Sequence, residues 1–239
     1  MVGILLAIAF GVVWLAAYWP PLFMDYWLWL VMIASAFLTL AAVSFIQIPL
    51  QNLAGQALIA LFSQQTLISW FPLVAIPQVL LSGLVQEASK LAPVVLWGLQ
   101  KGREEIDPRL GLLAGAVAGF GFGVFEAAWA HNAIFAAGWT WEGALGGGLT
   151  AFAGLWERFS SVAFHISATA LAGYGLARGW GWQFYLVAAF LHFLLNYGIV
   201  PLQMGIFNVI TLEIYLSVIA FALAGVILWL RWRGGSAYE

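Results

Sequence analysis

Seven long apolar segments constrain this chain more than any other feature of its sequence. They lie at about 1–18, 26–48, 66–100, 109–130, 148–177, 181–198 and 207–230. A helix that crosses a bilayer needs about 20 predominantly apolar residues, so the segments predict an all-α, polytopic bundle of seven transmembrane helices. Residues 49–65, apolar on one side and rich in amides on the other, predict an interfacial or half-inserted helix; if they crossed, they would form an eighth span.

The composition also indicates a membrane protein. Hydrophobic residues make up 64% of the 239 residues and charged residues 8%, and the mean hydropathy is +0.98. Soluble domains carry about 25% charged residues, so we expect a lipid bilayer to surround the chain. The net charge of −2, with no basic run, predicts no nucleic-acid partner. Residues 1–239 show no linker or repeat and are expected to form a single domain, and the lack of cysteine excludes disulfide and thiolate chemistry.

The basic residues predict an orientation in the membrane. Lysine and arginine gather in the loop 101–109, at Arg178 and at 231–233, whereas the loops 131–147 and 199–206 have none. Cytoplasmic loops are enriched in these two residue types. We therefore expect a multi-pass protein of the cell membrane with its C-terminus in the cytoplasm. Seven spans would then place the N-terminus outside, and an eighth span would reverse that.

Three polar residues, Gln86, Glu87 and Lys90, interrupt the apolar run 80–97. A carboxylate and an ammonium in hydrocarbon are costly unless they are paired, wetted or buried in protein. The two charges are i and i+3 neighbours on a helix, so they can partly neutralise each other. The cost that remains predicts partners on other helices.

A glycine ridge in the fourth segment predicts where one partner points. Gly111, Gly115, Gly119 and Gly123 recur at every fourth residue, and such small residues allow a neighbouring helix to approach closely. Glu126 follows Gly119 by seven residues and so lies on nearly the same face. We therefore expect its carboxylate to point into the bundle.

The fifth and sixth segments each carry a polar face. Arg158 and His165 are seven residues apart on one face, which Glu157 flanks, and His192 and Asn196 form an i, i+4 pair. Any one of these residues could have a purely structural role, as a member of an ion pair or of an interhelical hydrogen bond. Their number, spread over several segments, favours one convergent site.

Three chemistries fit these groups. A glutamate base with histidine and asparagine as oxyanion donors would hydrolyse a substrate with an activated water. A glutamate and two histidines, here Glu87, His165 and His192, would also satisfy a zinc ion. Buried carboxylates and histidines could instead relay protons in a proton-coupled carrier. No His-Glu-x-x-His or Gly-x-Ser-x-Gly motif occurs, so neither a zincin nor a serine nucleophile is indicated.

Four motifs in order resemble those of PrsW-type intramembrane proteases. They are Gln86-Glu87-Ala-Ser-Lys90, the Gly-Phe-rich run 119–126 that ends in Glu126, Glu157-Arg158 followed by His165 and Ser167, and His192-Phe-Leu-Leu-Asn196. The third also resembles a run of YhfC-like membrane peptidases. Both families belong to the superfamily of CAAX prenyl proteases and bacteriocin-processing enzymes. The resemblance covers about residues 80–198, which would form the catalytic core.

The resemblance implies an intramembrane endopeptidase whose substrates are membrane proteins or peptides. In it Glu87 would be the water-activating base or a metal ligand, and His165 would position the water or bind the metal. His192 and Asn196 would hold the oxyanion. The residues that would support the site are Gln86, Lys90, Glu126, Glu157 and Arg158.

One position departs from the family pattern, which has two consecutive glutamates where this chain has Gln86-Glu87. An amide cannot act as a base. If the first position carries catalysis in the relatives, the chain would be a catalytically inactive scaffold of the same fold. If the second position does, Gln86 replaces a supporting group.

Overall fold

The computed structural model describes residues 1–101 and 106–233, and these residues form helices joined by short loops. The segments are α1 (Val2–Tyr18), α2 (Trp27–Ala42), η1 (Val43–Gln47), α3 (Ile48–Leu61), α4 (Gln64–Ser69), α5 (Phe71–Lys101), α6 (Pro108–Ala136), α7 (Trp141–Gly147), η3 (Leu149–Phe152), α8 (Ala153–Ala177), α9 (Gly181–Tyr197), α10 (Ile199–Gln203) and α11 (Val209–Trp232). No strand occurs in the described ranges, so the all-α prediction is confirmed.

Five helical segments of the described chain are long and apolar enough to cross a membrane. They are Trp27–Leu61, Phe71–Gln100, Pro108–Ala136, Gly181–Gln203 and Val209–Trp232. The chain is therefore a helical membrane protein, but the prediction of seven or eight spans is wrong.

The missing spans have three separate physical reasons. α1 has 17 residues, which rise about 25 Å and so fall short of a hydrocarbon core about 30 Å thick. α8 is long enough to cross, but Glu157, Arg158 and His165, together with its serines, threonine and glycines, make it less apolar than the five candidate spans. Residues 48–61 do not form a separate interfacial helix, because the π-helical turn η1 joins them to α2 in one continuous helix.

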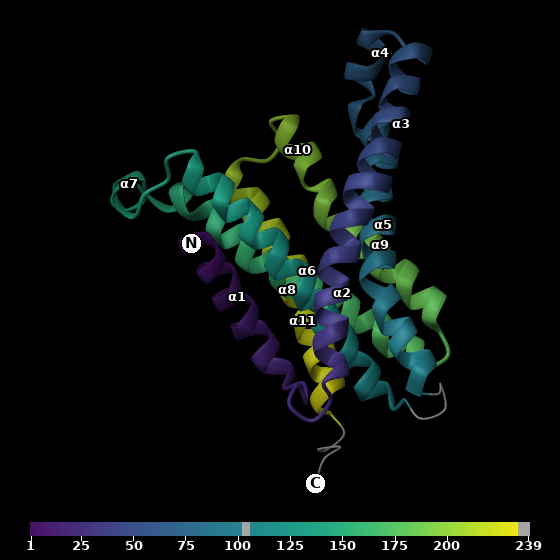
Figure 1. Ribbon diagram of the computed structural model, residues 1–239. Coiled ribbons are helices and arrows are strands. Elements are labelled where there is room, and N and C mark those ends of the chain that lie inside the picture. Colours follow the sequence, from purple (N-terminus) through teal and green to yellow (C-terminus); the bar gives the residue numbers. More distant parts are fainter. Residues whose placement is uncertain (102–105, 234–239) are drawn as a thin grey trace.

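The bundle is built around the antiparallel pair α6 and α8, which share the most extensive contact in the fold. α1 and α2 pack on α6, α11 packs on α8, and α9 joins α8 to α5. α3 and α4 project with the first turns of α5 beyond the rest of the bundle (Figure 1). Every predicted site residue therefore lies in the bundle and none in the projecting arm.

The predicted glycine ridge forms the contact between α6 and α8. A Cβ atom added at Gly115 would lie 2.2 Å from the carbonyl oxygen of Thr169, and one at Gly119 would lie 2.2 Å from that of His165. Neither distance is compatible with a side chain, so the backbones touch directly. The close approach predicted from the glycine spacing is confirmed, and it fixes the backbone of α8 at two of the positions that reach the polar centre.

A second glycine brings α5 against α9. A Cβ atom at Gly83 would lie 2.4 Å from the carbonyl oxygen of Ala189. Glu87 follows Gly83 by one helical turn, and His192 follows Ala189 by three residues. The contact therefore sets the two side chains opposite each other across the interface.

The C-terminal end of α11 is hydrogen-bonded to the C-terminal end of α1. Arg231 Nε donates to the carbonyl oxygen of Tyr18 over 2.9 Å, and Trp232 Nε1 donates to that of Ala17 over 3.1 Å. α1 and α11 thus finish at the end of the bundle where α5 also finishes (Figure 1). Of the charged loop used to predict the orientation, residues 102–105 lie outside the described residues. The cytoplasmic placement of this end stays a prediction.

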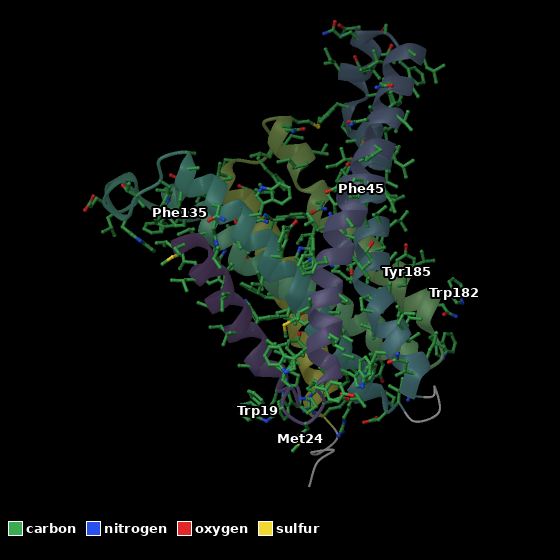
Figure 2. The ribbon with its side chains drawn as sticks, viewed as in Figure 1. Trp19, Met24, Phe45, Phe135, Trp182 and Tyr185 are labelled. Carbon is green, nitrogen blue, oxygen red and sulfur yellow. The ribbon has the colours of Figure 1, made fainter. Side chains whose placement is uncertain are left out.

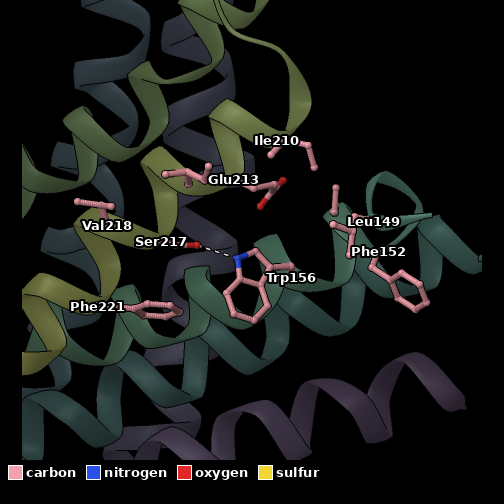
Figure 3. Close-up of a pocket in the computed structure, with 10 residues that line it drawn as sticks. Leu149, Phe152, Trp156, Ile210, Glu213, Ser217, Val218 and Phe221 are labelled. Atoms are coloured by element: carbon pink, nitrogen blue, oxygen red, sulfur yellow. Dashed lines mark hydrogen bonds between the residues drawn. The ribbon is translucent and has the colours of Figure 1, made fainter. Parts of the chain in front are cut away.

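Large apolar side chains cover the outside of the bundle, as a lipid environment requires. Phe45 is 80% exposed and Trp182 68% exposed (Figure 2). Polar contacts are kept between helices instead: Trp156 Nε1 of α8 donates to Ser217 Oγ of α11 over 2.8 Å (Figure 3).

Replacing Gly115 tests the close packing of α6 on α8. We expect Gly115→Ala to destabilise the protein by about 1–3 kcal/mol, because the added methyl group meets backbone that can move only with the whole helix. Thermal unfolding in detergent measures the effect. Gly225→Ala on α11 is the matched control, since a Cβ there meets nothing within 4 Å. Equal unfolding midpoints for the two variants would contradict the packing argument.

Candidate functional site

The polar centre begins with an ion pair on α5. Lys90 Nζ lies 2.6 Å from Glu87 Oε1, and both side chains are completely buried. Their i, i+3 spacing explains the contact. The pair leaves two further ammonium protons and the rest of the carboxylate to be satisfied by other helices.

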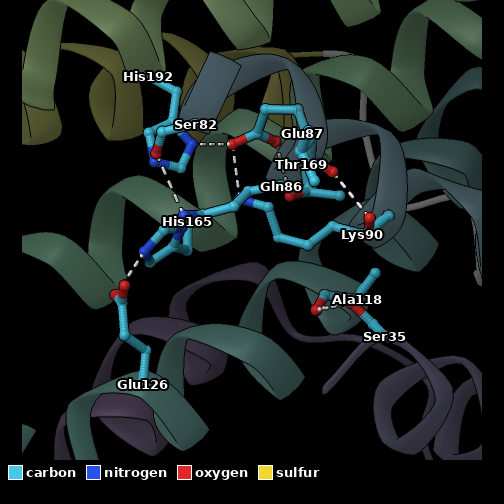
Figure 4. A network of polar contacts seen from close by, with 12 residues as sticks. Ser35, Ser82, Gln86, Glu87, Lys90, Ala118, Glu126, His165, Thr169 and His192 are labelled. Atoms are coloured by element: carbon cyan, nitrogen blue, oxygen red, sulfur yellow. Dashed lines mark hydrogen bonds and ion pairs between the residues drawn. The ribbon is translucent and has the colours of Figure 1, made fainter. Parts of the chain in front are cut away.

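The ammonium reaches α8. Lys90 Nζ lies 3.0 Å from His165 Nδ1, and His165 Nε2 lies 2.9 Å from Glu126 Oε2 on α6 (Figure 4). A protonated lysine only donates, so Nδ1 accepts and the ring proton sits on Nε2, which donates to Glu126. His165 therefore links the buried ion pair to a second carboxylate.

The carboxylate of Glu87 reaches α9 and α8. His192 Nδ1 lies 2.7 Å from Glu87 Oε1, and Thr169 Oγ1 donates to Glu87 Oε2 over 3.4 Å (Figure 4). A carboxylate only accepts, so Nδ1 of His192 carries the ring proton and donates it. In the neutral ring, Nε2 then keeps a lone pair that has no partner among the described residues.

Glu126 lies at the open side of the network. Its side chain is 31% exposed, and Arg158 Nη1 lies 3.3 Å from its Oε2. The guanidinium also forms a bidentate ion pair with Glu157. Ser161 Oγ donates to Glu126 Oε2 over 3.5 Å. One arginine thus balances two carboxylates, and the group carries a net negative charge when both are ionised.

A cavity of about 290 Å³ borders this open side. Its polar lining consists of Glu126, Glu157, Arg158, Ser161, His165, His192 and Asn196, and its apolar lining of Leu195, Ile199, Leu212 and Leu216. Glu87 and Lys90 are not among these residues. The imidazole of His192 therefore separates the buried ion pair from a space large enough for water and part of a substrate.

Gln86 belongs to a different set of contacts. Its Nε2 lies 3.2 Å from both Gln47 Oε1 and Ser82 Oγ, and its Oε1 is buried without a hydrogen-bond partner. Ser82 Oγ also accepts from Asn196 Nδ2 over 3.1 Å. Gln86 thus supports Asn196 through Ser82 and lies outside the series of contacts from Glu87 through Lys90 and His165 to Glu126.

Glu87, His165 and His192 form a buried group that could hold a metal ion, since one ligand atom from each lies within 4.8 Å of the others. The donor set suits zinc. However, Lys90 Nζ already contacts two of the three donors, Glu87 Oε1 and His165 Nδ1. A divalent ion in the same space would lie beside the ammonium, so the group does not fit a metal while Lys90 keeps this position.

Most of the residues predicted for the site meet in one network, namely Glu87, Lys90, Glu126, Glu157, Arg158, His165 and His192. Gln86 and Asn196 instead meet at Ser82. Ser82 and Gln47 were missed. Ser82 could have been found, because it precedes Gln86 by four residues on the same helix face, whereas nothing in the sequence points to Gln47. His131 lies outside these contacts and is fully buried, with its Nδ1 3.1 Å from the carbonyl oxygen of Gly3.

Comparison with known proteins adds no family. The chain matches no protein-family model, no curated protein and no solved structure. The resemblance to PrsW-type and YhfC-like proteases therefore rests on the four motifs, and the activity that it implies is carried forward as a proposal.

Removal of one charge tests the buried ion pair. We expect Lys90→Met to destabilise the protein by roughly 3–5 kcal/mol, because it leaves the Glu87 carboxylate buried without its counter-charge. The double variant Glu87→Gln/Lys90→Met should recover much of that loss, which thermal unfolding of the three proteins measures. Glu142→Gln, at an exposed position, controls for charge removal. Additive effects of the two changes would contradict the pairing.

Zinc binding tests whether Lys90 occupies the place of a metal. We expect the folded fraction of Lys90→Met to bind zinc more tightly than the unaltered protein, because Glu87 and His165 are then free to ligate. Metal analysis after equilibration with zinc measures the stoichiometry. His165→Ala in the Lys90→Met background should abolish the binding. Stoichiometric zinc in the unaltered protein, lost in His192→Ala, would show that Lys90 moves aside and that the group is a metal site.

Proposed function

We propose that this protein is an intramembrane endopeptidase in which His192 activates a water molecule. The observation that carries the proposal is the contact of 2.7 Å between Glu87 and His192, made at the wall of a polar cavity among apolar helices. A carboxylate bound to one ring nitrogen fixes the tautomer of histidine and leaves the other nitrogen as a base. The four motifs that resemble those of PrsW-type proteases support the same activity.

In the proposed reaction, a water molecule in the cavity gives one proton to His192 Nε2. Its oxygen attacks the carbonyl carbon of the peptide bond and forms a tetrahedral intermediate. When the carbon–nitrogen bond breaks, the proton on Nε2 passes to the departing amine. Glu87 stabilises the imidazolium that exists between these two transfers, and Lys90 holds Glu87 in place.

Asn196 is the proposed donor to the oxyanion. It lines the cavity, and one proton of its amide is held by Ser82 Oγ, so the second proton can reach a ligand in the cavity. His165 and Glu126 complete the polar lining and orient the site.

This assignment changes the role that the family resemblance implies for Glu87. The resemblance makes Glu87 the base that takes the proton from water. We propose that Glu87 acts through His192 instead, since its side chain is completely buried and its Oε1 is shared between Lys90 and His192. No step is assigned to zinc, because Lys90 occupies two of the donors that a metal would need.

A second candidate function is the proton-coupled carrier. It is favoured by the unbroken series of contacts from Glu87 through Lys90 and His165 to Glu126, which could relay protons. Proton-driven uptake into proteoliposomes that is lost in both Glu87→Gln and His165→Ala would support this function. The inactive scaffold stays a further alternative, and activity gained only with Gln86→Glu would favour it.

Alanine at His192 tests the proposed base. We expect His192→Ala to lower the cleavage rate about 10²–10⁴-fold, the usual contribution of general acid–base catalysis. Glu87→Gln should produce a similar loss, because it no longer stabilises the imidazolium. Mass spectrometry of a transmembrane peptide incubated with reconstituted protein measures cleavage, with Glu142→Gln as the control. Unchanged cleavage by folded His192→Ala would eliminate the assignment.

A further inference from the structure

A second hollow lies on the lipid-facing side of the bundle, between α8 and α11. This groove has a volume of about 640 Å³, and its walls include Phe152, Trp156, Ile210, Ile214, Val218 and Phe221 (Figure 3). Several of these side chains are exposed, among them Ile214 and Val218. The groove therefore opens to the membrane and would accept an apolar chain.

The carboxylate of Glu213 lies among these apolar side chains. Glu213 lines the groove and is 8% exposed. Its Oε2 is buried and has no hydrogen-bond partner in the described part of the chain. Trp156, which also lines the groove, already gives its indole proton to Ser217. A buried acceptor without a donor is costly, so the position is suited to a ligand that brings one.

The charges near Glu213 indicate the sign of that ligand. Arg158 is engaged by Glu157 and Glu126, so its guanidinium is already shared between two carboxylates. With Glu213, three carboxylates act on the single guanidinium of Arg158. The imbalance favours a cationic group over a neutral or anionic one.

The groove adjoins the candidate active site. Trp156 lines the groove and the next residue, Glu157, lines the polar cavity, while on α11 Leu212 lines the cavity and Glu213 the groove. A segment that lay in the groove would therefore be next to the cavity, separated from it by the side chains of α8 and α11.

From these observations we propose that the groove docks the membrane-embedded segment of the peptide substrate, with Glu213 binding a lysine or arginine side chain of that segment. The inference rests on the proposed peptidase function and adds the substrate class: an apolar segment that carries a basic residue. An acyl chain would fill the apolar walls but leave Glu213 without a donor, whereas a basic side chain with an aliphatic stem satisfies both features of the groove.

The cysteine-free chain permits a direct binding experiment. A fluorophore is attached at Val218→Cys, which lines the groove, and the protein is reconstituted in phosphatidylcholine vesicles. Nitroxide-labelled helical peptides of about 20 apolar residues are then titrated, carrying lysine, norleucine or glutamate at one position. We expect the lysine peptide to quench the fluorophore at concentrations about tenfold or more below the norleucine peptide, and the glutamate peptide to need the highest concentration.

Two controls separate docking in the groove from general partitioning into the bilayer. A fluorophore at Val226→Cys, exposed on α11 but outside the groove, should respond weakly and equally to the three peptides. Glu213→Gln should remove the preference for lysine, and Glu213→Asp should retain it. If Glu213→Gln does not fold, the relative affinities of the three peptides for the protein with Glu213 unaltered still test the proposal.

Equal quenching by all three peptides at Val218→Cys would overturn the proposal, as would a lysine preference that survives Glu213→Gln. Quenching that is no stronger at Val218→Cys than at Val226→Cys would indicate that lipid fills the groove, and it would also overturn the proposal. Peptide cleavage is followed in parallel by mass spectrometry. A lysine preference without cleavage would support the docking site and contradict the peptidase function. Cleavage without the lysine preference would support the peptidase function and contradict the docking site.

Discussion

Burial of the Glu87–Lys90 ion pair is the constraint on which the centre of this bundle depends. Both side chains are completely enclosed, and a buried pair is tolerated only when its remaining protons and lone pairs also find partners. Lys90 finds one in His165 of α8, and Glu87 finds one in His192 of α9. One ion pair on α5 therefore determines where two other helices must place their polar side chains.

Contacts of this kind require backbones that lie close together. Gly115 and Gly119 bring α6 directly against α8, and Gly83 brings α5 against α9. Lipid provides no hydrophobic drive for helices to associate, so close packing and interhelical hydrogen bonds must hold them. The glycine contacts and the polar network thus depend on each other: the glycines set the spacing, and the network specifies which faces meet.

The network has a sealed end and an open end, and the difference between them organises the proposed function. Glu87 and Lys90 are sealed, whereas Glu126, His192 and Asn196 border the cavity. A carboxylate at the sealed end can orient a base without contacting the substrate. The groove with Glu213 lies on the neighbouring faces of α8 and α11, so the proposed substrate segment and the proposed reacting groups share two helices.

The sequence by itself determined the features that depend on neighbours along one helix. These are the helices themselves, the i, i+3 pairing of Glu87 with Lys90, the glycine ridge, and the shared face of Arg158 and His165. Only the tertiary structure decided the rest. Glu126 rather than Glu87 reaches the cavity, Gln86 supports Asn196 through Ser82, and residues 48–61 extend α2 instead of lying separately. Each of these outcomes depends on how the helices are rotated relative to one another and on where each helix ends. Long-range packing sets this geometry, and helical periodicity in the sequence does not encode it.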